Sequence, residues 1–408
     1  MRILLAHPNY PSQMRPLAQA LAANKSNEVV FVTNQVNGEV SGVKKLVYTL
    51  KREPAAQTHR YLREYEKAVL HGQAACEACF LAKKQGFVPD LIIGHAGWGT
   101  TLFLKDVFPR APMALVFEWF YRSRGSDCDF DPSEPLTLDD EARIRIKNSA
   151  LLADLAACDG GIVPTQYQYE QFPHHLRSKL IVNHEGIDTN YFKPNPGAPL
   201  ILSGGKLDLT GITEIVTYAT RGMEPYRGFP QFVEAAHLLQ KKRPNVHVVI
   251  GGEDRVAYGK KAPDGKTYKQ IALERFPLDP KRTHFVGPLP YGEYLKLLQC
   301  TSAHVYLTRP FVLSWSLLEA MSCGALVVGS DTAPVREVIT DGINGVLVDF
   351  FRPDLLAEAL DRALEEPQKF EPMRRNARAT VLGKYEIGTC LRHKLEWLWN
   401  LTSNNRAG

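Results

Sequence analysis

Two arginines stand six residues apart in a loop that contains glycine, a spacing at which both could bind one anion. Arg221 and Arg227 follow the apolar run 214–219. Guanidinium groups bind phosphate oxygens through paired hydrogen bonds and stay charged when they lose water. Because ligands of parallel sheets bind beyond the carboxyl ends of the strands, this loop predicts a diphosphate site. The alternative is a pair of ordinary surface arginines.

A second anion site is expected where a later apolar run leads into a helix. The first N–H groups of a helix have no partner within it, and the helix dipole favours negative charge there. We therefore expect Val312, Leu313 and Ser314 to bind a phosphate group. Glu319, about one turn inside this helix, could accept hydrogen bonds from a ribose. Many helices begin with a serine and carry a glutamate, so this pattern alone does not identify a function.

Two glycines and two polar residues complete the candidate set. Gly251 and Gly287 end further apolar runs and are assigned to the same site as Glu319. His95 and Glu118 each directly follow an expected strand, and such positions lie at the edge where ligands bind. The alternatives are a histidine satisfied within a buried turn and a structural carboxylate.

Short β-branched runs alternate with amphipathic helical stretches along the chain, which predicts parallel sheets covered by helices on both faces. The chain is therefore predicted to be an α/β protein with two doubly wound, Rossmann-like domains facing a cleft. Proline-rich residues 192–199 mark the seam between residues 1–195 and 196–385. A terminal helix within 386–408 could pack back on the first domain. The expected strands are residues 2–6, 29–33, 91–94, 113–117, 161–163, 180–182, 214–219, 246–251, 283–286, 303–307, 325–329 and 345–348.

Composition places few limits on function. The 408 residues are 44% hydrophobic and 23% charged, ordinary values for a globular protein, and the net charge of +5 fits a solvated surface. No apolar run reaches the roughly 18 residues of a membrane span, and the N-terminal run is too short for a signal peptide. We expect a cytoplasmic protein, either free or peripheral at the inner membrane.

The cysteines and aspartates offer weak metal motifs. The seven cysteines are expected to be free thiols, and Cys76 and Cys79 lie within one predicted helix, residues 57–85. Helix packing explains this pair better than a redox or metal role, because no second pair follows at zinc-site spacing. Asp127 and Asp129, with Asp131 close by, resemble a metal-binding loop only in their letters.

The segment from residue 308 to 349 resembles the donor-binding region of glycosyltransferase family 4, the retaining GT-B enzymes. The resemblance rests on Leu317-Leu318-Glu319-Ala320-Met321 with Cys323-Gly324, then Pro334 with Glu337, then Asp341-Gly342-Ile343-Asn344-Gly345. Residues 184–194 resemble the family's interdomain signature. The first domain is similar to a bacterial subgroup in His7-Pro8-Asn9-Tyr10-Pro11 and Gly94-His95-Ala96-Gly97-Trp98-Gly99.

The resemblance implies transfer of a sugar from a nucleoside-diphosphate sugar to a hydroxyl acceptor, with the anomeric configuration retained. Arg221, Arg227 and the helix start would stabilise charge on the leaving phosphate, so neither a cofactor nor a metal is expected. His95 would lie near the sugar or the acceptor, and Glu118 on the acceptor side. A saccharide, a lipid-linked molecule or a protein could be the acceptor, and a modified base in nucleic acid remains an alternative. A dinucleotide-dependent oxidoreductase is disfavoured, because no G-x-G-x-x-G follows either first strand.

One departure from the family concerns the transferred sugar. Family members carry two glutamates separated by seven residues, and Glu319 matches the second. Phe311 stands at the position of the first, which in the family lies near the sugar. The resemblance therefore supports the nucleotide site better than the identity of the sugar, and a catalytically weak nucleotide-sugar binder is a further alternative.

Overall fold

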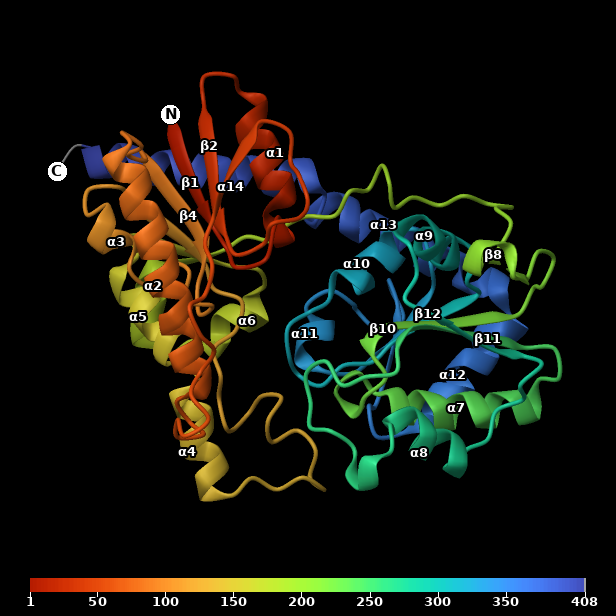
Figure 1. The fold of residues 1–408 in the computed structure, drawn as a ribbon. Coiled ribbons are helices and arrows are strands. Elements are labelled where there is room, and N and C mark those ends of the chain that lie inside the picture. The colour runs from red at the N-terminus through yellow and green to blue at the C-terminus, as the bar shows by residue number, and fades with distance from the viewer. Residues whose placement is uncertain (407–408) are drawn as a thin grey trace. The chain divides into compact units, whose positions relative to one another are not determined.

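The computed structural model describes residues 1–406. The chain forms two compact units, each with its own parallel sheet (Figure 1). Unit 1 comprises Met1–Glu185 and the C-terminal segment from Thr389, and unit 2 comprises Gly186–Gly388. The division thus falls before the proline-rich segment that marked the seam in the sequence. The two doubly wound units match the predicted fold class, while the cleft between them stays a prediction.

The sheet of unit 1 has seven parallel strands in the order β3-β2-β1-β4-β5-β6-β7. Six match the predicted strands, and β3 was not predicted. β3 is an edge strand that carries two adjacent lysines and buries none of its residues, so it lacks the apolar run that marks a central strand. The strands are β1 (Arg2–Ala6), β2 (Glu28–Thr33), β3 (Val43–Val47), β4 (Leu91–His95), β5 (Met113–Val116), β6 (Gly160–Val163) and β7 (Leu180–Val182).

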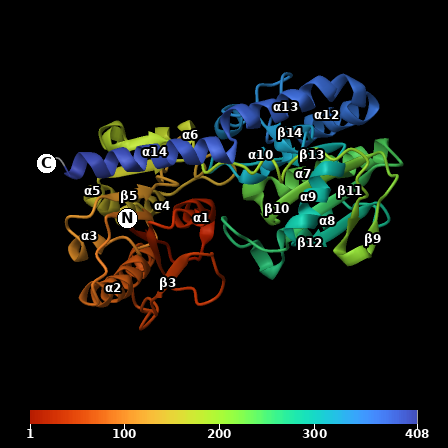
Figure 2. The same cartoon turned by 90° about the horizontal axis from the view of Figure 1, so that it is seen from above.

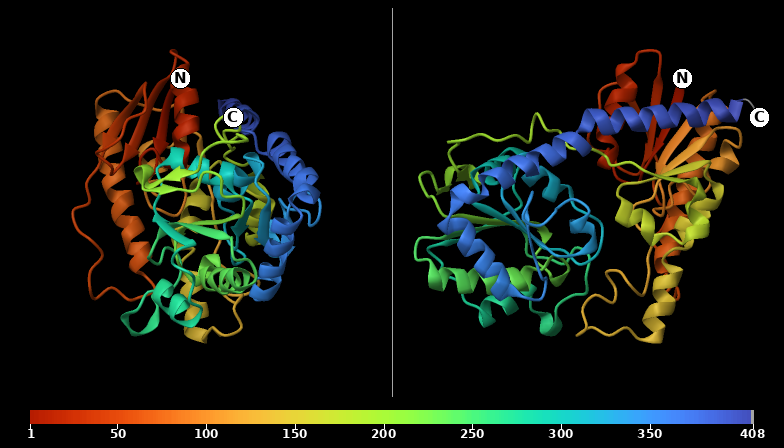
Figure 3. Two further views of the ribbon diagram at one scale, coloured as in Figure 1. Left: turned by 90° about the vertical axis from the view of Figure 1, so that its right-hand side faces the viewer. Right: turned by 180° about the vertical axis from the view of Figure 1, so that it is seen from behind.

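Helices cover both faces of this sheet, because alternate residues of each strand point to opposite sides. Leu4 and Ala6 pack with α2 and α5, whereas Ile3 and Leu5 pack with α1 and α14. Figures 2 and 3 show the long helix α14 running along the face opposite α2. The helices are α1 (Arg15–Ala23), α2 (Arg63–Lys84), α3 (Leu104–Val107), α4 (Leu138–Ile146), α5 (Ser149–Ala157), α6 (Gln166–Gln171) and α14 (Ile387–Arg406).

Helix α14 is fitted closely to the sheet that it covers. Its Leu398 is fully buried in the core of unit 1. A side chain on Gly160 of β6 would come within 2.8 Å of the Trp397 ring, so only glycine lets the helix approach this far. The terminal helix expected from the sequence therefore packs on unit 1.

Unit 2 is built on six parallel strands in the order β12-β11-β10-β13-β14-β15, all six at the predicted positions to within a few residues. A short antiparallel hairpin, β8 (Ile201–Leu202) with β9 (Leu207–Asp208), precedes them and was not predicted. The strands are β10 (Ile215–Gly222), β11 (His247–Glu253), β12 (Thr283–Gly287), β13 (Ala303–Tyr306), β14 (Val327–Ser330) and β15 (Val346–Val348).

In unit 2, α10 and α13 cover one face of the sheet, and α7 packs against α12 on the other (Figure 1). The helices are α7 (Phe229–Lys242), α8 (Tyr268–Arg275), α9 (Tyr291–Cys300), α10 (Trp315–Ser322), α11 (Ala333–Arg336), α12 (Pro353–Glu365) and α13 (Glu371–Lys384). Between Met1 and Arg406 no helix is long and apolar enough to cross a bilayer.

Both sheets bring candidate residues to a topological switch point, where the strand order reverses. In unit 1, β1 pairs with β4, so His7, just after β1, lies near His95 at the end of β4. In unit 2, β10 pairs with β13, so Arg227 after β10 meets Thr308 after β13. Ligands of doubly wound sheets bind at such points. Each unit is therefore expected to hold its site there.

Candidate functional site

Arg227 is a buried cation surrounded by neutral groups. It is 8% exposed, and its Nη1 donates to Thr308 Oγ1 at 2.7 Å. Both terminal nitrogens reach the Val312 carbonyl at 3.3–3.4 Å, and the guanidinium lies 5.1 Å from the centre of the Tyr258 ring. No ion pair joins it to a carboxylate of the described chain. A buried charge of this kind is normally paired, so an anionic ligand is its expected partner.

Arg221 lies in a different environment from Arg227. It is exposed near the end of β10, while Arg227 is buried in the loop that follows. Arg309, in the segment that follows β13, is a second buried arginine: it is 5% exposed, its backbone N–H donates to the Tyr226 carbonyl, and its guanidinium lies 5.6 Å from the Tyr226 ring. Sequence reasoning gave Arg309 no role. Its position directly after a predicted strand and a threonine was the available signal.

Glu224 anchors the loop that carries Tyr258 and was also missed. Its carboxylate is fully buried and accepts the backbone N–H groups of Ala257, Tyr258 and Gly259 at 2.7–3.3 Å. Three N–H donors satisfy a buried carboxylate without any cation. The Glu224 carboxylate therefore fixes this loop, and the loop places the Tyr258 ring against Arg227.

Phe311 packs into an aromatic group at the same place. Its ring makes edge contacts with Tyr226 and Tyr258, at centroid distances of 5.2 and 5.7 Å. The residue at the position of the family's first glutamate is thus part of a ring cluster that flanks Arg227 and Arg309. The structure gives Phe311 a packing role, and its side chain, unlike the family's glutamate, has no hydrogen-bonding group.

The start of α10 only partly fits the predicted phosphate site at Val312, Leu313 and Ser314. The expectation of free N–H groups is wrong for Ser314, whose N–H donates to the Tyr306 hydroxyl at 2.9 Å. The Ser314 hydroxyl caps the N–H of Ser316, as an N-cap serine commonly does. Val312 presents its carbonyl to Arg227. The helix start therefore contributes the Val312 carbonyl that helps to hold Arg227, and of its N–H groups that of Ser314 is already used.

Glu319 is buried and held by two tyrosines. Its Oε1 accepts from the Tyr291 hydroxyl at 2.7 Å and its Oε2 from the Tyr294 hydroxyl at 3.0 Å. Burial raises the pKa of Glu319, and the two tyrosine hydrogen bonds act in the opposite direction. Each carboxylate oxygen keeps a lone pair that can accept a further hydrogen bond.

The two candidate glycines differ in their surroundings. A side chain at Gly287, where φ is +66°, would meet nothing within 4 Å. A side chain at Gly251 would make only ordinary contacts with Leu289 and Ala219. The neighbour Gly252 is the constrained one: at φ +126°, a Cβ would lie 2.0 Å from the Thr220 carbonyl oxygen. The close approach that fixes the end of β11 therefore depends on Gly252.

In unit 1, His95 and Glu118 are brought together as a pair. His95 is 2% exposed, and its Nε2 lies 3.7 Å from Oε2 of Glu118, whose side chain is 42% exposed. His7 lies beside them, with its ring centre 5.2 Å from that of His95. Trp98 contacts both histidine rings at 6.1 and 6.4 Å. His7 and Trp98 belong to the motifs that resemble the bacterial subgroup, but neither was predicted as a site residue.

Asp154 supports the loop that carries Trp98. Its carboxylate accepts the Gly97 N–H and the Thr101 hydroxyl, each at 2.8 Å. Burial raises the pKa of Asp154 to about 7, against the lowering effect of these two hydrogen bonds. A Cβ on Gly99 would lie 1.9 Å from the Ala68 carbonyl oxygen, so α2 packs directly on the backbone of the loop.

The weak metal motifs of the sequence have local roles. Asp129 accepts the N–H groups of Gly125 and Ser126, and Asp131 accepts from Ser133. Cys76 and Cys79 are free thiols within α2. Within the described part of the chain, no three histidine, cysteine, aspartate or glutamate side chains gather as a group that could hold a metal ion.

Two family models match the chain, one in each half. The model described as "Glycosyl transferase family 4 group" matches residues 25–192, and that described as "Glycosyl transferases group 1" matches residues 212–380. The D-inositol 3-phosphate glycosyltransferase of Corynebacterium glutamicum is 26% identical over 286 residues, which are 67% of this chain and 62% of that protein. The alpha-D-kanosaminyltransferase of Streptomyces kanamyceticus is 27% identical over 42% of each chain. The matches thus span less than two thirds of these relatives.

Solved structures share the fold over the whole chain. A sucrose-phosphate synthase from Thermosynechococcus elongatus superposes with a TM-score of 0.72 at 16% identity, covering 99% of this chain and 100% of that one. HepE of Anabaena, solved in complex with UDP-glucose, gives a TM-score of 0.69 at 16% identity, covering 98% and 100%. At this identity the likeness shows the GT-B fold.

Proposed function

The chain belongs to glycosyltransferase family 4, and we propose that it transfers a glycosyl group from a nucleoside-diphosphate sugar to a hydroxyl acceptor, with the anomeric configuration retained. The observation that carries the proposal is Arg227, a buried cation among neutral groups at the switch point of unit 2. A diphosphate supplies the negative charge that its own surroundings lack. Two further arginines lie near the ends of these strands: Arg221 near the end of β10 and Arg309 after β13.

In this reaction the bond between the anomeric carbon and the β-phosphate oxygen breaks, and the electron pair leaves with the phosphate. Negative charge therefore grows on the β-phosphate, where Arg227 can stabilise it without reorganising, because Thr308 and Val312 already hold its guanidinium. The acceptor oxygen forms the new bond to the anomeric carbon, and its proton passes to the departing phosphate. We propose that these arginine contacts take the place of a divalent metal.

Glu319 is proposed to bind the ribose of the donor nucleotide. Its carboxylate is fixed by Tyr291 and Tyr294, which leaves it room to accept from ribose hydroxyls. Gly287 has open space where a side chain would stand, and we propose that the backbone there contacts the nucleotide, while Gly251, which is buried, lies on the neighbouring strand. His95 and Glu118 of unit 1 are assigned to the acceptor side.

A ligand screen followed by a turnover assay tests this function. Nucleoside diphosphates and their sugars are expected to raise the melting temperature, since a ligand at about 100 times its Kd stabilises the folded state by about 2.7 kcal/mol. Donors that bind are then incubated with and without saccharide acceptors while nucleotide release is followed. No stabilisation by any nucleotide would contradict the donor site. Binding without release across the panel would show a nucleotide-sugar binder rather than an enzyme.

A further inference from the structure

A small cavity opens in unit 1 at the edge of the sheet opposite His95 and Glu118. It has a volume of about 380 Å³ and is formed where β4 and β5 begin, whereas the two site residues stand at or just beyond the ends of these strands. We infer that this cavity and the cations around it form a docking surface for a partner protein. The partner segment that fits carries a large apolar side chain next to carboxylates. This docking does not depend on the proposed function, because none of its residues belongs to the candidate site.

The walls of the cavity are mostly apolar and stiff. They include Val88 and Pro89 from the segment before β4, and Phe108, Pro109 and Pro112 from the segment before β5. Proline has a fixed φ angle and no N–H group, so these segments offer few hydrogen-bond donors. Ligand pockets have volumes of about 300–1,000 Å³, and this cavity is at the small end, a size for one side chain rather than a cofactor. An apolar side chain is therefore the favoured occupant.

The lining of the cavity also carries more positive than negative charge. Lys83 and Arg110 belong to it, together with one carboxylate, that of Asp90. Asp90 already accepts the backbone N–H of Arg2 at 2.8 Å, and Lys83 donates to the Val107 carbonyl at 2.6 Å. Arg110 is exposed, and its side chain makes no hydrogen bond or ion pair with the described residues. A carboxylate of a partner would supply the counter-charge that Arg110 lacks.

Helix α2 packs against α3 beside the cavity and extends this surface (Figure 1). Phe80 precedes Lys83 and Lys84 by three and four residues, so the three side chains share one face of the helix. The Phe80 ring is 47% exposed, and the Lys84 ammonium lies 4.6 Å from its centre without an ion pair to the described residues. Val88, in the cavity wall, is 50% exposed. We define the docking surface as Phe80, Lys83, Lys84, Val88 and Arg110, which combine exposed apolar groups with cations.

The charges and the cavity of the docking surface together fit a protein segment. Carboxylates can pair with Lys84 and Arg110, and complementary charges of this kind select partners and speed their association. A nucleic acid would pair its phosphates but offers no apolar side chain for the cavity. A lipid bilayer lies against raised apolar groups and does not fill a narrow cavity between prolines. A docked segment would leave the carboxyl ends of the strands open, so the partner could hold the enzyme without blocking its site.

A selection of short random peptides displayed on phage, with the whole protein as the target, tests the docking surface. We expect the selected peptides to place phenylalanine, tryptophan or leucine beside aspartate or glutamate. Their affinity, measured by fluorescence anisotropy, should fall at least about tenfold in Arg110→Glu and in Lys84→Glu, because attraction becomes repulsion. Val88→Ser should weaken binding as well, through the loss of apolar contact. Added salt should weaken binding to the parent, since these charges are exposed.

Two matched variants serve as controls. Lys25→Glu reverses an exposed lysine elsewhere in unit 1, and Val36→Ser removes a valine that is 73% exposed. Both should bind the peptides as the parent does. No enriched peptides, peptides without the acidic and apolar pattern, or equal affinity in Arg110→Glu would overturn the docking surface. So would binding to vesicles of equal phosphatidylglycerol and phosphatidylcholine, or a dimer in sedimentation velocity, that Arg110→Glu abolishes, because a membrane or a second copy of the chain would then be the occupant.

Discussion

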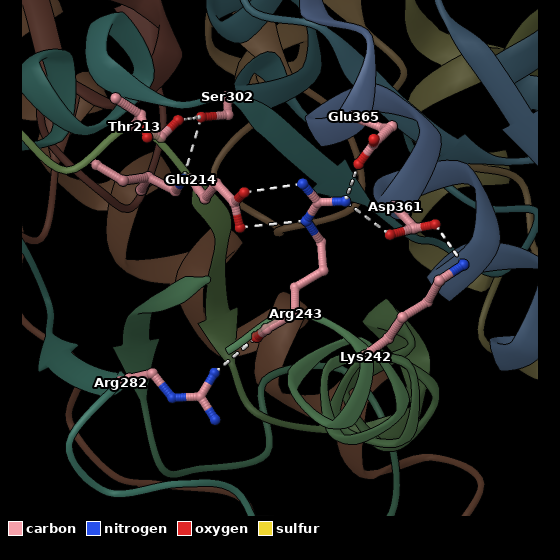
Figure 4. Close-up of polar contacts among 9 residues, drawn as sticks. Thr213, Glu214, Lys242, Arg243, Arg282, Ser302, Asp361 and Glu365 are labelled. Carbon is pink, nitrogen blue, oxygen red and sulfur yellow. Dashed lines mark hydrogen bonds and ion pairs between the residues drawn. The ribbon is translucent and has the colours of Figure 1, made fainter. Parts of the chain in front are cut away.

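Arg243 and Arg227 lie at opposite ends of the sheet of unit 2, and their surroundings differ. Arg243 follows α7 and binds Glu214, which precedes β10, through two nitrogens at 2.8 and 3.2 Å. Its third nitrogen reaches Asp361 and Glu365 of α12 at 2.9 Å (Figure 4). Among the described residues, Arg227, at the other end of β10, contacts only neutral oxygens and an aromatic ring.

The contrast separates an arginine whose charge is paired within the fold from one that we propose binds an anionic ligand. The carboxylates around Arg243 come from separate parts of the chain, so the ion pairs tie α7, α12 and the start of the sheet together. Lys242 binds Asp361 as well, and the Arg282 guanidinium donates to the Arg243 carbonyl. Charge at Arg243 is thus neutralised within the fold. Charge at Arg227 is desolvated but not neutralised, an arrangement typical of sites that act on anions.

Replacing Arg227 should have the largest effect, and on activity rather than stability. Arg227→Met is expected to lower kcat/KM for the donor by about 10²–10³-fold, the usual effect of removing one preorganised group that stabilises transition-state charge. The ligand-free variant should melt at the same temperature or higher, because an unpaired buried charge is lost. Donor kinetics and thermal melts together measure this. Lower stability with intact turnover would show that Arg227 is a structural residue and does not act on the donor.

Arg243→Met should show the opposite pattern. We expect a loss of about 2 kcal/mol in the free energy of unfolding, because three carboxylates lose their shared cation, and kcat/KM within about twofold of the parent. Urea unfolding at pH 7 measures the loss. Arg336→Met, which removes an exposed arginine paired with Asp331, is the matched control and should have little effect.

The pH dependence of Arg243→Met gives a second check. Hydrogen bonds from Lys242 and then from Arg243 lower the pKa of Asp361. A carboxylate whose pKa is lowered on folding contributes stability above its unfolded value of about 3.9, and this is lost as the pH falls through the folded value. The difference between parent and variant should therefore shrink below about pH 4. A difference that persists at pH 3 would show that packing, not charge, is responsible.

The strands and the role of Arg227 as a site residue were predicted from the sequence. The partners by which Arg227 and Arg243 differ were not. Apolar runs mark buried strands, and all twelve predicted strands are present within a few residues of their predicted positions. The edge strand β3 was missed because it lacks such a run. Arg221 and Arg227 were predicted to lie in one loop, and only the fold shows that Arg221 is exposed within β10 and that Arg227 is buried in the loop that follows.

Contacts between distant segments explain what else was missed. Glu224 binds backbone groups more than thirty residues later, and Glu319 is held by tyrosines that precede it by 25 and 28 positions. Neither pairing leaves a local pattern. Likewise, no local pattern in the sequence indicates that the Tyr306 hydroxyl accepts the Ser314 N–H. This N–H group at the start of α10 was therefore predicted to be free.

Tyr294→Phe should have a moderate effect and extend the comparison to carboxylates. Without this hydroxyl, one of the two hydrogen bonds that oppose burial is lost, so the pKa of Glu319 should rise further. A larger protonated fraction accepts ribose hydroxyls less well, and we expect the donor KM to rise by roughly three- to tenfold at pH 7.

That increase in KM should diminish as the pH is raised, because Glu319 ionises again, while kcat changes little. A purely structural defect would not depend on pH in this way. Tyr268→Phe removes a tyrosine hydroxyl that donates to the Lys260 carbonyl and serves as the control. A KM that is raised equally at pH 7 and pH 9 would argue against Glu319 as the ribose acceptor.

Lys242→Ala should have the smallest effect and tests why the Arg243 cluster is stabilising. Lys242 and Arg243 both bind Asp361, but the Lys242 side chain is 69% exposed and the Arg243 side chain 14%. Exposed ion pairs contribute roughly 0.2–1 kcal/mol and are screened by salt, so the loss should lie in this range and disappear at 0.5 M salt. The Arg243→Met loss should largely persist there, since partly buried pairs are screened less. The free energy of unfolding of both variants is measured in urea at low salt and at 0.5 M salt. If Lys242→Ala and Arg243→Met lose the same amount at both concentrations, then the number of ion pairs, rather than their burial, determines the contribution.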